Sequence, residues 1–196
     1  MILSNLAIHA ALDSGRLVIK PEPKPRVASI DEPKCAYQTT SVDLRLGSEL
    51  QFPREDKAFL FDLRKGPIAK SINESYKSVR IDRGNDYNLE PHRFVLGQTI
   101  EFVSFPILTD QTCLAGRVEG KSSLARCGLI IHLTAPTIHA GFAGKITLEM
   151  INLGHNSIVL YEGMDICQLI IEAVDGTPTE KLSQFHGQTR PSGVRQ

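Results

Sequence analysis

The feature that most constrains the fold is a long succession of short, strand-like segments between Ser41 and Val174. The first, SVDLRLG, alternates so that Val42, Leu44 and Leu46 share one face. Similar segments follow, separated by glycine, proline or asparagine: HRFVLGQTIEFVSF, TCLAGRVE, GLIIHLT, GKITLEMIN, SIVLYEG and DICQLIIEAV. Many short strands with turn residues between them, and only one or two helices, predict a β barrel or β sandwich.

The remaining segments are expected to decorate this β structure. Ser4 can cap a short N-terminal helix that Gly15 ends. Residues 52–91 are charged and irregular in pattern, which predicts a loop or hairpin excursion on the surface. Residues 184–196 lie in a polar stretch with glycine and proline, which predicts a mobile tail or a lid. A chain of 196 residues fits one domain, and we expect residues 1–196 to form it.

Composition excludes several kinds of function. The 22 basic and 22 acidic residues balance, so no overall charge attracts nucleic acid or an anionic membrane, and neither is expected as a partner. The cysteines are widely spaced, which favours reduced thiols and a cytoplasmic location; they are Cys35, Cys113, Cys127 and Cys167. The H-x-E and P-C-x-x-C motifs of the zinc nucleoside deaminases are absent from the sequence, so no zinc site is expected. If the protein hydrolyses a base, its own side chains must activate the water.

A Gly-Lys-Ser-Ser turn at residues 120–123 is the first candidate for a ligand site. It offers backbone N–H groups, two hydroxyls and the Lys121 ammonium, which suit a polyphosphate. A short helical run follows, and Arg126 falls four residues after Ser122. An ordinary capped helix with a surface arginine stays open as the alternative, because the turn lacks the spacing of a P-loop.

The second candidate is Glu149, a carboxylate on an otherwise regular strand. In residues 145–151, Ile146, Leu148 and Met150 face one side, whereas Lys145, Thr147 and Glu149 face the other. A solvated carboxylate is the alternative. The neighbouring segments are apolar enough to cover both faces, however, and a buried glutamate needs a partner. Arg126 is the partner we expect, and proton transfer is the role that suits such a carboxylate.

Two histidines flank the turn at Ala135-Pro136-Thr137. His132 and His139 are each more typical of a structural residue than of a catalyst when taken alone. His139 precedes Ala140-Gly141-Phe142, a turn from which a side chain can reach a ligand sugar.

Read together, these segments resemble the deoxycytidine triphosphate deaminases of the dUTPase-like superfamily. The matching segments cover most of the chain apart from about 50–90 and 173–183: MILSNLAIHAALDSGRLVI, TTSVDLRLG, NLEPHRFVLGQT, GKSSLARCGLIIHLTAPTIHAGFAGKITLE, LYEGMDICQL and QFHGQ. The resemblance implies a distorted β barrel with a short N-terminal helix and a C-terminal lid. It also implies a homotrimer in which each active site forms at a subunit interface.

The same resemblance implies roles for individual residues. Glu149 would be the acid/base, assisted by Ser122 and Arg126 in placing the water, and Gln184 and Gln188 would close on the phosphates. Mg²⁺ would accompany the triphosphate. The full implied substrate-binding set is Lys121, Ser122, Ser123, Leu124, Ala125, Arg126, Ala135, His139, Thr147, Leu148, Glu149, Gln184 and Gln188.

Three positions depart from the family pattern. His139 stands where the family usually has an aspartate that contacts the deoxyribose 3′-hydroxyl. Lys121 stands where arginine is common, and Gln184 where lysine is common. These changes bear on substrate affinity more than on fold.

The function that the resemblance implies is hydrolytic deamination of dCTP to dUTP and ammonia, without zinc. Two alternatives stay open. One is a bifunctional enzyme or a pure dUTPase that releases pyrophosphate and dUMP, against which the replacement at His139 argues modestly. The other is a trimeric nucleotide-binding module without catalysis, against which the presence of Glu149 and Arg126 argues.

Overall fold

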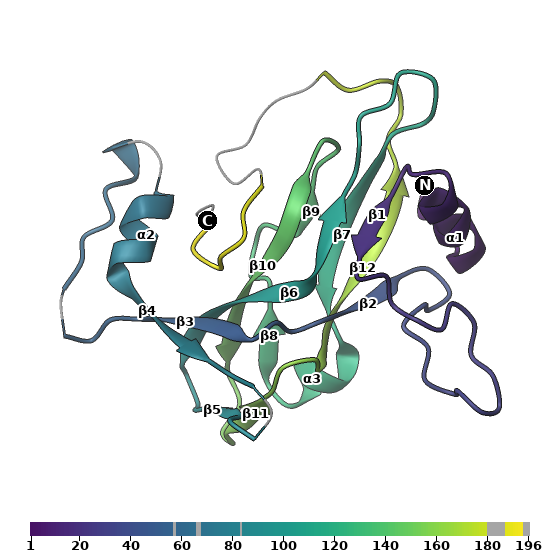
Figure 1. Ribbon diagram of the computed structural model, residues 1–196. Coiled ribbons are helices and arrows are strands. Elements are labelled where there is room, and N and C mark those ends of the chain that lie inside the picture. The colour runs from purple at the N-terminus through teal and green to yellow at the C-terminus, as the bar shows by residue number, and fades with distance from the viewer. Residues whose placement is uncertain (57, 66–67, 83, 180–186, 194–196) are drawn as a thin grey trace.

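Two antiparallel sheets contain most of the strands (Figure 1). The computed structural model describes residues 1–56, 58–65, 68–82, 84–179 and 187–193. The first sheet has the order β4-β3-β6-β10-β8, and β1 also pairs with β6. Its strands are β1 (Val18–Lys20), β3 (Glu49–Pro53), β4 (Tyr76–Arg80), β6 (Phe94–Ser104), β8 (Leu129–Ile131) and β10 (Ala143–Asn152).

The second sheet has the order β2-β12-β7-β9, and a separate two-stranded ribbon pairs β5 with β11. These strands are β2 (Val42–Arg45), β5 (Tyr87–Leu89), β7 (Leu114–Gly120), β9 (Thr137–Ile138), β11 (Ile158–Leu160) and β12 (Asp165–Ala173). Each strand-like segment named from the sequence therefore contains a strand, and the predicted mainly β fold class is confirmed.

The core lies where the alternating apolar faces of these strands meet. Val42, Leu44 and Leu46 are fully buried, as their alternation predicts. An isolated bridge between Leu46 and Thr99 links the end of β2 to β6, and so connects the two sheets. Asp43 breaks the expected pattern, because it is buried as well. A carboxylate in that position needs a compensating partner.

The helices are short. α1 (Asn5–Asp13) begins where predicted, with the Ser4 hydroxyl accepting the backbone N–H of Ala7 at 3.3 Å, and Gly15 follows it with a left-handed φ of 73°. α3 (Ser122–Arg126) confirms the predicted helical run after Gly120. Among the residues with described placement, no helix combines the length and apolarity needed to cross a membrane.

The excursion between the first two strands of the larger sheet is a hairpin carrying a helix, in agreement with the prediction for residues 52–91. β3 and β4 pair in register from Glu49 opposite Arg80 to Pro53 opposite Tyr76. A 3₁₀ turn (Leu63–Lys65) and α2 (Ala69–Ser75) lie between them. The chain therefore passes from α2 directly into β4. Figure 1 shows α2 and β10 on opposite sides of the C-terminal residues 187–193.

Candidate active site

The strand β10 aims one row of side chains into a cavity of about 960 Å³. Exposure alternates along the strand as predicted: Ile146, Leu148 and Met150 are buried in the core, while Thr147 and Glu149 line the cavity, which Ile146 also borders. The Leu148 side chain is fully buried, so a place along the base stays a prediction for its backbone. Only its backbone remains for a ligand.

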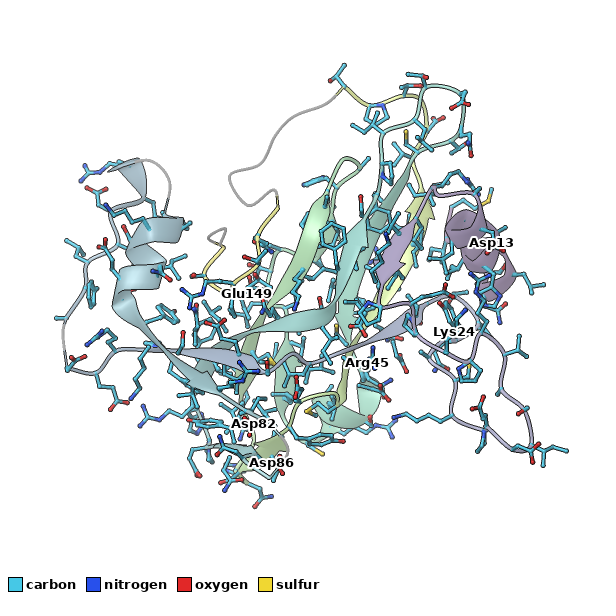
Figure 2. All side chains as sticks on the ribbon, in the orientation of Figure 1. Asp13, Lys24, Arg45, Asp82, Asp86 and Glu149 are labelled. Carbon is cyan, nitrogen blue, oxygen red and sulfur yellow. The ribbon has the colours of Figure 1, made fainter. Side chains whose placement is uncertain are left out.

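The cavity brings together five residues of the predicted substrate site. They come from three segments of the chain: the residues on either side of β9, the strand β10 and the C-terminal residues 187–193. These residues are Ala135, His139, Thr147, Glu149 and Gln188. Segments that are far apart in sequence thus converge on one chamber, and Figure 2 shows Glu149 in the middle of the molecule beside the C-terminal segment.

Glu149 has a close neighbour within its own chain, and that neighbour is His132. Nδ1 of His132 lies 2.7 Å from Oε2 of Glu149, with the imidazole 6% exposed and the carboxylate 31% exposed. The backbone N–H of His132 also donates to the carbonyl of Glu149 at 2.8 Å. Neither atom completes a hydrogen bond in this geometry, so the pair is a close polar contact between an imidazole nitrogen and a carboxylate oxygen.

The prediction that Arg126 pairs with Glu149 is wrong within one chain. α3 ends at Arg126, β8 follows, and His132 comes after β8. Because an extended strand advances about 3.3 Å per residue, the three residues of β8 put roughly 10 Å between the helix and His132. The arginine and the glutamate therefore belong to opposite ends of β8.

The whole 121–126 segment is separate from the cavity. None of its residues is among those that line the chamber, and none is buried. Arg126 itself is exposed and, among the described residues, forms no ion pair. The predicted site therefore divides into two parts in a single chain. One surrounds Glu149, and the other is presented on the surface by α3.

Lys121, at the start of α3, is engaged by the protein itself. Its ammonium forms an ion pair with Asp43 of β2, the buried carboxylate noted above, which also accepts from Nε2 of Gln38 at 3.2 Å. Gln168 of β12 donates to the carbonyl of Gly120 at 3.3 Å. The turn before α3 is thus tied to the second sheet, and the lysine is not a free phosphate ligand in this chain.

The described part of the predicted lid is packed against β10. Gln188 is 7% exposed, and its Nε2 donates to the carbonyl of Lys145 at 2.8 Å. The backbone N–H of Gly187 donates to the carbonyl of Ala143 at 2.8 Å. Gln184 and residues 194–196 lie outside the described residues. In this arrangement Gln188 lines the cavity, but its amide nitrogen is used by the protein.

Sequence reasoning missed most of the residues that line the cavity, and three of them bear on the site: His132, Ile72 and Tyr76. His132 was interpreted as structural, although the antiparallel pairing of β8 with β10 sets it beside Glu149. Ile72 and Tyr76 come from the hairpin excursion, for which no role was predicted. Burial raises the pKa of Tyr76, so its phenol stays neutral around pH 7. No pattern within those segments points to the cavity, because the pairing that carries them there is long-range.

The comparisons with known proteins identify a family. The family model described as dCTP deaminase-like matches residues 2–174. A dCTP deaminase, dUMP-forming, of Dictyoglomus thermophilum is 39% identical, covering all of this chain and 94% of the relative. A dCTP deaminase of Natronomonas pharaonis is 35% identical, again covering all of this chain and 94% of the relative.

A solved structure shares the fold. It is the crystal structure of 2′-deoxycytidine 5′-triphosphate deaminase from Agrobacterium tumefaciens, with a TM-score of 0.61 and 22% identity. The match covers 87% of this chain and 47% of that longer chain, so the present protein spans about half of it. The long sequence matches and the shared fold agree, and the chain belongs to the dCTP deaminase-like family.

Proposed function

We propose that this protein hydrolyses the exocyclic amine of dCTP, with Glu149 as the general acid/base. The observation that carries the proposal is the position of Glu149, which is a half-buried carboxylate on the wall of a chamber large enough for a nucleotide. The relatives named as dCTP deaminases support the choice of substrate.

The chemistry needs one carboxylate and one water. The ionised Glu149 takes a proton from water, and the resulting hydroxide adds to carbon 4 of cytosine while that proton passes to ring nitrogen 3. Proton transfer to the amine then lets ammonia leave, so dCTP and water become dUTP and ammonia. General acid/base catalysis contributes about 10²–10⁴-fold, and positioning of the water must supply much of the remainder.

His132 has a supporting role in this scheme. Its Nδ1 is 2.7 Å from the carboxylate and its backbone N–H is bonded to the backbone of the same residue. A small rotation of the imidazole would let an N–H at Nδ1 donate to the carboxylate and restrain it in one orientation. It acts on Glu149 and not on the substrate.

We further propose that a neighbouring copy of the chain completes the site, in a homotrimer. What supports this is the division of the predicted residues: Ser122, Ser123 and Arg126 are exposed at α3, away from the chamber that holds Glu149. Their hydroxyls and backbone N–H groups would hold the triphosphate over the neighbour's chamber, and Arg126 would place the water. A closed ring of three such interfaces gives three equivalent sites.

Mg²⁺ is proposed to arrive with the triphosphate. The described residues bring together no group of three His, Cys, Asp or Glu side chains that would hold a metal. In the proposed complex, phosphate oxygens and water would supply most of the ligands of the magnesium ion. It would neutralise phosphate charge, while the residues described above handle the proton. Cytoplasmic location stays a prediction from the unpaired cysteines.

A second candidate function is deamination followed by release of pyrophosphate, giving dUMP. The name of the Dictyoglomus relative, dUMP-forming, favours it. His139 argues the other way, because it lines the chamber where a carboxylate is usual in the family that the sequence resembles.

Product analysis separates the two. The purified protein is incubated with Mg²⁺ and either dCTP or dUTP, and ammonia, pyrophosphate, dUTP and dUMP are measured. Ammonia and dUTP from dCTP, with dUTP itself stable, support deamination alone. Ammonia together with pyrophosphate and dUMP supports the bifunctional reaction. Pyrophosphate without ammonia contradicts the deaminase proposal.

A further inference from the structure

The helix α2 lies next to the C-terminal segment, here defined as residues 187–193. Oγ of Ser192 donates to Oδ1 of Asn73 on α2 at 3.2 Å. Ser192 is 2% exposed, whereas Asn73 is on the exposed side of the helix. The hydroxyl is therefore buried by the contact and has this helix as its partner.

Two further contacts fasten the same segment to the hairpin and to β10. Nε of Arg190 lies 3.6 Å from Oε1 of Glu49, at the start of β3. Oγ1 of Thr147 donates to the carbonyl of Pro191 at 3.3 Å. The segment thus crosses from the strand that carries Glu149 to the hairpin that carries α2, as Figure 1 shows.

The segment and α2 are also walls of the same chamber. Ile72 and Tyr76 line it from the hairpin, and Pro191, Ser192 and Gly193 line it from the C-terminal segment. β4, which follows α2 directly, pairs with β3 over five residues, and β3 pairs with β6, the neighbour of β10, so the sheet connects α2 to β10. A helix joined directly to this sheet at the chamber's edge is a suitable anchor for a segment that borders the chamber.

We propose that α2 is the docking platform of the C-terminal segment and that Asn73 is a positioning residue, holding this segment against the chamber through Ser192. The inference rests on the proposed function for its effect on the substrate, but the docking itself does not. It assigns a role to the hairpin excursion, for which the sequence motifs predicted none.

Hydrogen exchange of the backbone amides in residues 187–193 tests the docking without any substrate. A neutral hydrogen bond changes an opening equilibrium by about 2- to 12-fold, so Asn73→Ala should accelerate exchange in this segment by that factor. Asn73→Asp keeps the acceptor and should stay within about twofold of the wild type. Alanine is a better helix former than asparagine, so α2 itself should not be weakened.

The matched control is Glu74→Ala on the same helix. Glu74 is exposed and only 4.0 Å from Lys70, with no contact to the segment among the described interactions. It should leave the exchange rates unchanged. Ser192→Ala should match Asn73→Ala, and the double variant should add nothing further because both remove one interaction. Equal exchange in Asn73→Ala and Glu74→Ala, or additive effects in the double variant, would overturn the proposal.

Kinetics test the positioning role. Asn73→Ala should raise the KM for dCTP by a factor similar to the exchange effect, and Asn73→Asp should restore it, with kcat changed less than about twofold because no reacting group is touched. Faster exchange with an unchanged KM would contradict a positioning role. If the wild-type protein does not turn over dCTP, the proposed function is refuted. The docking of the C-terminal segment on α2 is still tested by hydrogen exchange, which needs no substrate.

Discussion

The two halves of the candidate site, one around Glu149 and one at α3, differ in burial and in their contacts within the chain. Around Glu149, side chains are half-buried and tied together: His132 approaches the carboxylate, and Gln188 is bonded to β10. At α3, no residue is buried and Arg126 has no ion pair among the described residues. The first half can operate as part of one chain, whereas the second half presents its groups outward. That contrast is what a site shared between two copies requires.

The largest predicted effect is at the buried half. Glu149→Gln keeps the shape of the side chain but removes its ability to accept a proton, so kcat should fall by about 10²–10⁴-fold while dCTP still binds. Steady-state kinetics and equilibrium binding of dCTP measure the two quantities. Turnover close to that of the wild type would remove Glu149 from the mechanism.

In the α3 half, we expect Lys121 to contribute mainly to stability and Arg126 mainly to activity. Lys121→Ala leaves the buried Asp43 carboxylate without its cation, so it should lower the free energy of unfolding by about 1–3 kcal/mol. Arg126→Ala, the control on the same segment, should leave stability within about 0.5 kcal/mol and reduce activity instead. Urea denaturation with intrinsic fluorescence of the tyrosines compares them. Equal stability losses would show that α3 is not divided in this way.

A smaller effect is expected for His139 on the chamber wall. A carboxylate accepts a stronger hydrogen bond from a hydroxyl than a neutral imidazole does, so His139→Asp should leave the KM for dCTP unchanged or lower it by up to about tenfold. The same variant should be tested for pyrophosphate release from dUTP. A marked rise in KM would mean that the histidine has a role of its own in this protein.

The smallest effect serves as a reference outside both halves. The Arg26 guanidinium, aided by Lys24, lowers the pKa of Glu22 from 4.5 to about 2. Because the folded-state pKa is the lower one, this contribution to stability is complete above about pH 4.5 and is lost as the pH falls towards 2. Glu22→Gln should flatten that part of the stability curve, measured by thermal unfolding between pH 2 and 6. Kinetic losses above pH 5 then belong to the site and not to this cluster.

The local secondary structure of both halves could be predicted from the sequence. Alternation along residues 145–151 identifies which side chains leave the core, and the helical run after Gly120 is found as α3. Gly128, just after α3, is an example of a local requirement for one residue type. It has a φ of 92°, and a Cβ there would lie 2.4 Å from the backbone nitrogen of Gly154. Only glycine fits this position after the helix.

The partners of these residues could not be found in the same way. Periodicity tells which face a side chain takes, but not what another strand brings to that face. Glu149 meets His132 because β8 and β10 pair, and Lys121 meets Asp43 across 78 positions of sequence. The contact between α2 and the C-terminal segment joins residues that are 119 positions apart. Each depends on the assembled sheets and on no local pattern.

Mixing two inactive variants tests the division of the site most directly. Glu149→Gln and Arg126→Ala are each purified, unfolded together and refolded at equal concentrations, with each variant refolded alone as the control. If every site combines α3 of one copy with β10 of another, random assembly restores about a quarter of the sites to full composition, and deaminase activity returns in the mixture. Activity no greater than in the separate variants, in mixed oligomers verified by native mass spectrometry, would contradict a shared site.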